Sequence, residues 1–122
     1  MTTNRPSERP PFRVTPIVLH VLLTMADGET HGYRIMKEVA ERTHGRLKIG
    51  PGSLYFTLDR LLSADLIEEA EPRPKPDGDD SRRKYYQLTA HGRDVLREEV
   101  RSLADLVDFA RGKQLLADPE PV

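Results

Sequence analysis

The sequence predicts a mainly α fold that contains one small β-hairpin. Ten prolines divide the 122 residues into segments, and proline marks helix boundaries because it lacks an amide hydrogen and clashes with the preceding turn. Four of these segments carry apolar residues at helical spacing. Two short strand-like runs, 67–71 and 84–88, flank Asp77-Gly78, a pair typical of a tight hairpin turn. Three helices, a hairpin and a fourth helix form a winged helix-turn-helix followed by a C-terminal helix.

The first two helices are predicted from their caps and their apolar spacing. Thr15-Pro16 supplies an N-cap followed by proline at the first helical position, so we expect a mostly buried helix over 17–26. Gly28 ends that helix, and Thr30 caps a second one that runs to about Glu41. The apolar residues of the second helix at helical spacing are Tyr33, Met36, Val39 and Ala40.

Gly50-Pro51 opens a third helix with two different faces. One face carries the leucines, at positions 54, 58, 61 and 62, and we expect it to pack into the core. The opposite face carries Gly52, Ser53, Phe56, Asp59 and Arg60, with Tyr55 at its edge. A helix in the major groove of DNA reads bases with its N-terminal residues, and its free amides attract phosphate. This helix is therefore a candidate recognition helix.

The outward residues of the third helix suit contacts with DNA. Gly52 and Ser53 are small enough for close approach, and the Tyr55 hydroxyl can donate to a phosphate. Arg60 can reach a phosphate or a guanine, and Phe56 can contact a thymine methyl group. The alternative is an ordinary amphipathic helix with a solvated outer face, and an outward phenylalanine weakens that alternative.

The hairpin between the two strands is rich in basic residues. Three prolines, at 72, 74 and 76, prevent ladder hydrogen bonds near its tip, so we expect pairing only at its base. A basic hairpin beside a recognition helix is suited to phosphate contact, although Asp79-Asp80 near the tip opposes it. A solvated hairpin of mixed charge is the alternative. The side chains that we assign to DNA contact in this wing are Lys75, Arg82, Arg83 and Lys84.

A long fourth helix, capped by Thr89, is predicted from Ala90 to about Arg111, and it can extend to Ala117. Its apolar residues follow the 4, 3, 4, 3 spacing of a coiled-coil seam. No later element can cover this stripe, so we expect it to form a homodimer. The alternative is packing against the first helix of the same chain. The predicted dimerisation residues are Leu96, Val100, Leu103, Val107 and Ala110.

Charge and composition exclude several classes of protein. With 19 Lys and Arg against 20 Asp and Glu, the net charge of −1 argues against indiscriminate binding of polyanions. Residues 45–60 and 72–89 are nevertheless locally basic, and a phosphate senses charge within about 8–10 Å. The absence of cysteine excludes disulfides, thiolate zinc sites and a cysteine nucleophile.

Membrane, metal and enzymatic functions find no support in the pattern. The longest apolar run, Ile17 to Leu23, is broken by His20 and is far shorter than the ~20 residues of a membrane span. The N-terminus does not resemble a signal peptide. We therefore expect a cytoplasmic protein. The four histidines are scattered, and no nucleotide-binding loop or nucleophile motif is present. We expect no cofactor, no metal and no enzymatic activity.

Four motifs in a fixed order carry a family resemblance: Thr30 to Ile35, Gly50 to Tyr55, Leu61 to Ile67, and Arg83 to Thr89 with Gly92. They resemble the PadR family of bacterial transcriptional regulators, from about Thr15 to Arg111. The resemblance implies a winged-helix homodimer of the compact subgroup with a single short C-terminal dimerisation helix. It also implies DNA contacts by Tyr55 with its neighbours and by residues 82–84.

Two positions depart from the family pattern. Asp65 stands where the family usually has glycine, at a turn with a left-handed residue, and aspartate tolerates that conformation better than most residues. Phe56 stands where the family often has proline or a basic residue. The operator sequence therefore cannot be carried over from relatives.

The residues and the resemblance together predict a sequence-specific DNA-binding repressor that binds a palindromic operator as a homodimer. The expected organisation is a flexible arm (1–14), a winged helix-turn-helix (15–89), a dimerisation helix (90–117) and a tail (118–122). Two alternatives remain open: a protein-binding module anchored by Phe56, and a small-molecule sensor at the dimer interface with weak DNA binding. Family members often respond to small aromatic or drug-like effectors, but the fourth helix offers only Phe109 as an aromatic, so the effector is unassigned.

Overall fold

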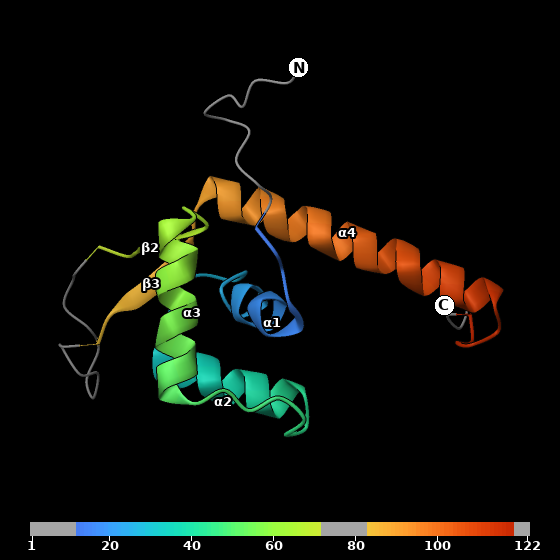
Figure 1. Cartoon of the computed structure of the whole chain (residues 1–122), viewed down its shortest axis with the longest axis horizontal. Helices are drawn as coiled ribbons and strands as arrows, with labels where there is room; N and C mark the ends of the chain where they lie inside the picture. Colours follow the sequence, from blue (N-terminus) through green and yellow to red (C-terminus); the bar gives the residue numbers. More distant parts are fainter. Residues whose placement is uncertain (1–11, 72–82, 119–122) are drawn as a thin grey trace, which may run out of the picture.

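A computed structural model describes residues 12–71 and 83–118 of the chain. The helices α1, α2 and α3 gather beside a small sheet, and most of α4 extends away from this body (Figure 1). The mainly helical class with a small sheet is confirmed. The elements in order are α1 (Pro16–Thr24), β1 (Thr30–His31), α2 (Gly32–Arg42), α3 (Pro51–Ser63), β2 (Ile67–Glu69), β3 (Tyr85–Leu88) and α4 (Ala90–Gly112).

Side-chain caps set the start of two helices as predicted. The Thr15 hydroxyl oxygen accepts a hydrogen bond from the Val18 amide at 3.3 Å, and that of Thr89 accepts from the Gly92 amide at 2.9 Å. Proline at the first position of α1 and of α3 also agrees with the prediction. The end of α4 at Gly112 also agrees with the expected end near Arg111, whereas α1 ends at Thr24, two residues before the expected Ala26.

The start of α2 corrects the sequence prediction. Thr30 does not cap this helix but is buried in β1, where it pairs with Tyr86 of β3. His31 is the cap, and its Nδ1 accepts a hydrogen bond from the Arg34 amide at 3.2 Å. The strand β3 also pairs with β2, so the predicted hairpin is the larger part of a three-stranded antiparallel sheet. A strand of two residues is too short to show an alternation in sequence.

The core lies between the sheet and the four helices, and it includes the first part of α4. On α2 the buried residues are Gly32, Ile35 and Val39, whereas Tyr33 is 61% exposed, so its predicted place on the apolar face was wrong. Leu96 is only 5% exposed and belongs to this core. The first part of α4 packs against α1 of the same chain. Leu96 is therefore corrected from a dimer contact to a core residue.

Asp65 forms the turn between α3 and β2 in the left-handed conformation, with φ of 62°. The amides of Asp65 and Leu66 donate to the carbonyls of Leu62 and Leu61, both at 3.0 Å, which closes the end of α3. The Thr89 hydroxyl donates to the Asp65 carbonyl at 2.7 Å. This bond joins the end of α3 to the start of α4, as the left-handed turn expected at Asp65 allows.

His20 joins α1 to the end of α2. Arg42 Nε donates to His20 Nδ1 at 3.2 Å, and Arg42 Nη2 donates to the His20 carbonyl at 2.9 Å and to the Thr24 hydroxyl at 3.1 Å. Partial burial, and then the neighbouring Arg42 guanidinium, lower the pKa of His20. A proton on this imidazole would therefore oppose the contact between the two helices.

We expect acid to weaken the fold through His20. The unfolded chain takes up a proton at this imidazole near pH 6.5, before the folded chain does, so the free energy of unfolding falls as the pH drops below about 6.5. His20→Gln removes this proton uptake. Urea unfolding measures the free energy of unfolding of both proteins. As the pH is lowered from about 7 to 5, the value for the wild type should fall relative to that for the variant. A difference that stays constant over this range would contradict the assignment.

Candidate nucleic-acid interface

The helix α3 presents the two faces that its sequence predicts. Leu54, Leu58 and Leu61 are fully buried in the core. On the outer side, Phe56 is 66% exposed and Tyr55 is 47% exposed. The remaining predicted contact residues of this helix are also exposed: Gly52, Ser53 and Arg60. This outer surface of α3 is open to a partner.

The N-terminus of α3 lacks a side-chain cap. Its N-cap is Gly50, which has no side chain, and Pro51 follows at the first helical position. The other three helices in residues 12–71 and 83–118 are capped by Thr15, His31 or Thr89. First-turn amides have no partner within their own helix, and together with the helix dipole they favour an anion. The start of α3 is therefore free to receive a phosphate.

Tyr55 lies across the start of α2. A Cβ atom added to Gly32 would lie 2.7 Å from the Tyr55 hydroxyl oxygen and 3.3 Å from Leu54 Cδ2. Glycine at this position thus lets α3 approach α2 closely.

Tyr86 is buried in the sheet, and burial raises its pKa, with smaller contributions from Glu69, Tyr55 and Asp59. This buried ring remains a neutral part of the core.

The base of the wing contacts the start of α2 through aromatic rings. The Arg83 guanidinium carbon lies 5.9 Å from the centre of the Tyr33 ring. That ring is stacked on His31, with centroids 6.5 Å apart, and His31 meets the Tyr85 ring edge-on at 5.2 Å. Arg83 and Lys84 are both exposed. The other two predicted wing residues, Lys75 and Arg82, lie outside the described residues.

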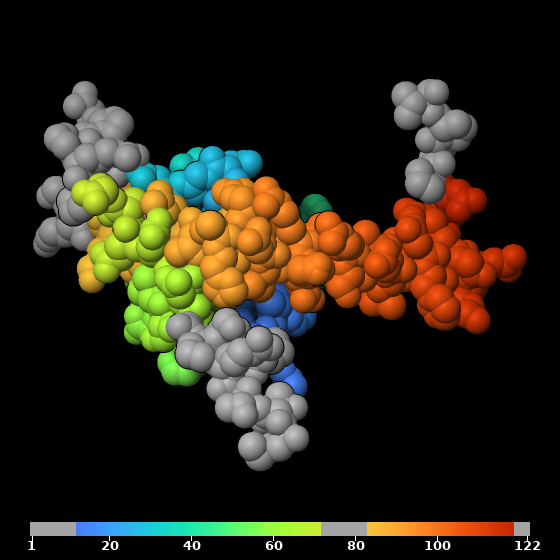
Figure 2. All heavy atoms as spheres, turned by 90° about the horizontal axis from the view of Figure 1, so that it is seen from above, coloured from blue at the N-terminus to red at the C-terminus, as the bar shows by residue number. Residues whose placement is uncertain are grey.

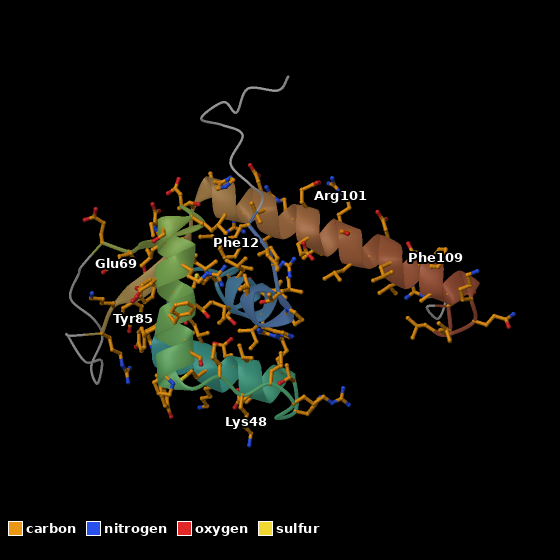
Figure 3. All side chains as sticks on the ribbon, viewed as in Figure 1. Phe12, Lys48, Glu69, Tyr85, Arg101 and Phe109 are labelled. Atoms are coloured by element: carbon orange, nitrogen blue, oxygen red, sulfur yellow. The ribbon has the colours of Figure 1, made fainter. Side chains whose placement is uncertain are left out.

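Arg60 contacts a ring from the segment that precedes α1. Its guanidinium carbon lies 5.2 Å from the centre of the Phe12 ring. Phe12 and Val14, which we assigned to the N-terminal arm, are partly buried against the core. A shallow hollow on the outer side of α3 is lined by Phe56, Asp59, Arg60, Ser63 and Ala64. In the view of Figure 3, Phe12 and Tyr85 lie on opposite sides of α3.

The aromatic contacts of this surface were missed by the sequence prediction. Tyr33 was placed on the apolar face of its helix, and His31 was counted among scattered histidines. Both meet the wing only because β1 pairs with β3, which aligns His31 with Tyr85. The nearest signal in the sequence is the motif of residues 30–35, which carries part of the family resemblance.

Five exposed basic side chains before α3, on α3 and at the base of the wing have no acidic partners among the described residues. No described residue forms an ion pair with any of them, since the ion pairs found lie on α2 and α4. Their charges are therefore available to an external anion. The set consists of Arg46 and Lys48 in the turn before α3, Arg60 on α3, and Arg83 and Lys84 at the base of the wing.

The far part of α4 carries apolar side chains that the body does not cover. Leu106 is 62% exposed and Phe109 is 65% exposed, and Val100 and Val107 are exposed as well. Figure 2 shows this part of the helix standing clear of the rest of the molecule. Leu103 and Ala110, the two remaining predicted dimer residues, are partly covered.

Neither a membrane-spanning helix nor a metal-binding cluster is found in the described part of the chain. Among residues 12–71 and 83–118, no helix combines the length and the hydropathy needed to cross a membrane. The same residues contain no group of three or more histidine or acidic side chains placed to hold a metal ion.

A helix-turn-helix whose second helix exposes an uncapped N-terminus with arginine and aromatic side chains, next to a basic hairpin base, defines a winged-helix protein of the DNA-binding type. The chain belongs to the PadR family, because the model described as "Transcriptional regulator PadR-like family" matches residues 18–98. It is therefore a transcriptional regulator of this family, a class that implies DNA binding.

The chain is also similar to individual proteins, of which one relative and one solved structure are named as transcriptional regulators. The chain is 36% identical over 103 residues to transcriptional regulator Rv3488 of Mycobacterium tuberculosis, covering 84% of this chain and 90% of that protein. It is 38% identical over 95 residues, 78% of this chain, to an uncharacterised 37.1 kDa protein in transposon TN4556 of Streptomyces fradiae, of which it spans only 25%. A PadR family regulator from Clostridium difficile has a similar structure, with 26% identity, a TM-score of 0.67 and coverage of 80% and 97% of the two chains.

Proposed function

We propose that this protein represses transcription by binding a palindromic DNA operator as a homodimer in the cytoplasm. The observation that carries the proposal is the uncapped N-terminus of α3, which lies beside the start of α2 and the basic base of the wing. In this proposal residues 15–89 bind DNA and residues 90–117 form the dimer, with 1–14 as an arm and 118–122 as a tail.

The predicted contact residues of α3 have distinct parts in the proposed complex. The first-turn amides at Gly52 and Ser53 bind a phosphate, and the Tyr55 hydroxyl donates to another. Phe56 contacts a thymine methyl group from the major groove, and Arg60 reaches a guanine edge or a phosphate. At the wing, Lys75, Arg82, Arg83 and Lys84 contact the phosphate backbone.

In the proposed dimer, the far part of α4 joins the two chains and so sets the distance between their two α3 helices. Apolar side chains at Val100, Leu103, Val107 and Ala110 are available to a second copy of the chain. A twofold dimer presents its two α3 helices about one turn of DNA apart, roughly 34 Å. The operator is therefore expected to be palindromic.

Footprinting on the DNA that flanks the protein's own gene tests the proposal. We expect a protected site with dyad symmetry. If each protomer neutralises about four phosphates, the logarithm of the binding constant should fall with the logarithm of the salt concentration with a slope near −7. A slope near zero, or protection without symmetry, would contradict the proposed complex.

Arg60 and Arg83 are expected to differ in what they contribute. Arg60→Ala should weaken binding to the operator by about 1–3 kcal/mol and leave binding to a mutated operator nearly unchanged. The preference for the operator over the mutated operator should therefore decrease. Arg83→Ala should weaken binding to all duplexes about equally and reduce the salt slope by about 1. Competition binding with both duplexes at several salt concentrations measures the two effects. Identical behaviour of the two variants would refute this division of roles.

Two observations support additional candidates. The exposed Phe56 suits a protein partner, and a protein-binding module would give no footprint on DNA. Phe109 is an exposed ring with Lys113 Nζ 5.3 Å from its centre, at the far end of α4. We propose that a small aromatic or drug-like effector that releases DNA would bind near this end of the dimer, and thermal-shift screening with phenolic and cationic compounds tests it.

A further inference from the structure

Two arginines of the proposed DNA surface lie against aromatic rings that belong to other elements. Arg60 of α3 faces Phe12 at 5.2 Å, and Arg83 at the base of the wing faces Tyr33 at 5.9 Å. Neither guanidinium has a hydrogen bond or ion pair with another described residue. We propose that Phe12 and Tyr33 are positioning residues, which hold Arg60 and Arg83 in the orientation that meets DNA. The inference rests on the proposed function and adds two residues to it.

A ring can orient an arginine without consuming its donors. A cation over a ring is attracted by the negative face of the ring, and this attraction uses none of its N–H groups. The five N–H groups of an arginine in such a contact therefore remain available to a phosphate or a guanine. An ion pair with a carboxylate would instead occupy two of these donors and cancel the charge. Aromatic contacts are therefore the kind of support that a DNA-binding arginine requires.

Both rings are held in place by their surroundings. Phe12 is partly buried against the core, so its ring is fixed relative to α3. Tyr33 is 61% exposed and adds little to the core, but it is stacked on His31. The His31 ring is fixed by the hydrogen bond that it accepts from the Arg34 amide and by its edge-on contact with the Tyr85 ring. A fixed ring lowers the number of rotamers that its arginine must lose on binding.

The exposure of Tyr33 supports this interpretation. Exposed tyrosines at the start of a helix contribute neither a cap nor buried area, and the cap of α2 is His31. Its ring instead contacts the His31 ring and the Arg83 guanidinium. Tyr33 thus connects the helix-turn-helix to the wing at the point where the wing's strand begins.

A double-mutant cycle tests the pair Tyr33 and Arg83. The probe is a fluorescent duplex that the wild-type full-length protein selects from a random-sequence library. Tyr33→Leu should weaken binding about two- to fivefold in the wild-type background, the range of an exposed cation–π contact, and have almost no effect when Arg83 is already alanine. Tyr33→Phe keeps the ring and should bind like the wild type. Because Tyr33 is exposed, thermal melting of these variants should match that of the wild type.

The same cycle on Phe12 and Arg60 has a different readout. Phe12→Leu keeps an apolar side chain against the core but removes the ring face, and it should relax the discrimination between operator and mutated operator as Arg60→Ala does. Phe12→Tyr should retain the discrimination. In the Arg60→Ala background, Phe12→Leu should cause no further loss.

The outcomes separate this inference from the proposed function. Losses that add in the double variants, or a loss in Tyr33→Phe, would show that the rings act on DNA directly or through the fold, and would overturn the inference alone. A wild-type protein that selects no duplex from the library would overturn both. Coupled losses with rescue by the conservative variants would establish both rings as positioning residues.

Discussion

Replacing Gly92 by alanine is expected to destabilise the fold by about 3 kcal/mol or more and to lower the melting temperature by roughly 10 °C. Gly92 is buried in the first turn of α4. A Cβ atom there would overlap the carbonyl oxygen of Leu66 and would lie 2.8 Å from its carbonyl carbon. That backbone cannot rotate aside, because the Leu66 carbonyl accepts the Thr89 amide at 3.1 Å. The strain must move α4 away from the turn between α3 and β2.

Gly112→Ala is the matched control in the same helix. Gly112 is the last residue of α4, and an added Cβ atom would meet no other atom within 4 Å. Alanine favours helix over glycine by up to about 1 kcal/mol, so this variant should be slightly more stable than the wild type. Urea unfolding of both variants measures the contrast. Equal effects of the two substitutions would contradict the close approach of Gly92 to Leu66.

The contact at Gly92 also matters for the proposed function. Gly92 and the bond from the Thr89 hydroxyl to the Asp65 carbonyl fix the start of α4 against the end of α3. The proposed dimer helix and the proposed recognition helix therefore meet at one rigid corner. The direction of α4 from this corner determines where the second α3 of a dimer lies, and hence the spacing of the two half-sites.

The helices could be predicted from sequence because their signals are local. Thr15 and Thr89 cap their helices within the next three residues, and the leucines of α3 repeat at helical spacing. The left-handed turn at Asp65 followed from the family resemblance and from the tolerance of aspartate. The strand β1 could not be predicted in this way, since its only basis is pairing with a strand more than fifty residues later.

Apolar spacing alone does not say which surface covers a residue. Leu96 and Val100 belong to the same heptad stripe, yet Leu96 is 5% exposed and Val100 is 44% exposed. The difference arises because α1 covers only the first part of α4. The aromatic contacts of Arg60 and Arg83 were equally inaccessible, because each joins residues that only the tertiary fold brings together. By contrast, the exposed set on α3 followed directly from the helical period.

The largest functional loss is expected from placing charged side chains in the exposed apolar part of α4, which includes Val100, Leu106, Val107 and Phe109. Val100→Lys with Val107→Lys places four ammonium groups in the proposed dimer interface. Each valine contributes about 1.5–3 kcal/mol when fully buried, so the dimer should weaken at least about a hundredfold. Both side chains are exposed in the single chain, so its fold should persist. Sedimentation equilibrium measures the change in oligomeric state.

DNA binding by the same variant distinguishes a dimer effect from a charge effect. The added lysines should strengthen non-specific attraction to phosphate, but losing the second recognition helix should lower operator affinity by at least about a hundredfold. Asp94→Asn with Asp105→Asn adds the same charge on exposed positions of α4 and should leave the dimer intact. Because the two variants carry equal charge, only the loss of the partner can make their operator affinities diverge. Equal operator binding by both would show that α4 does not form the functional dimer.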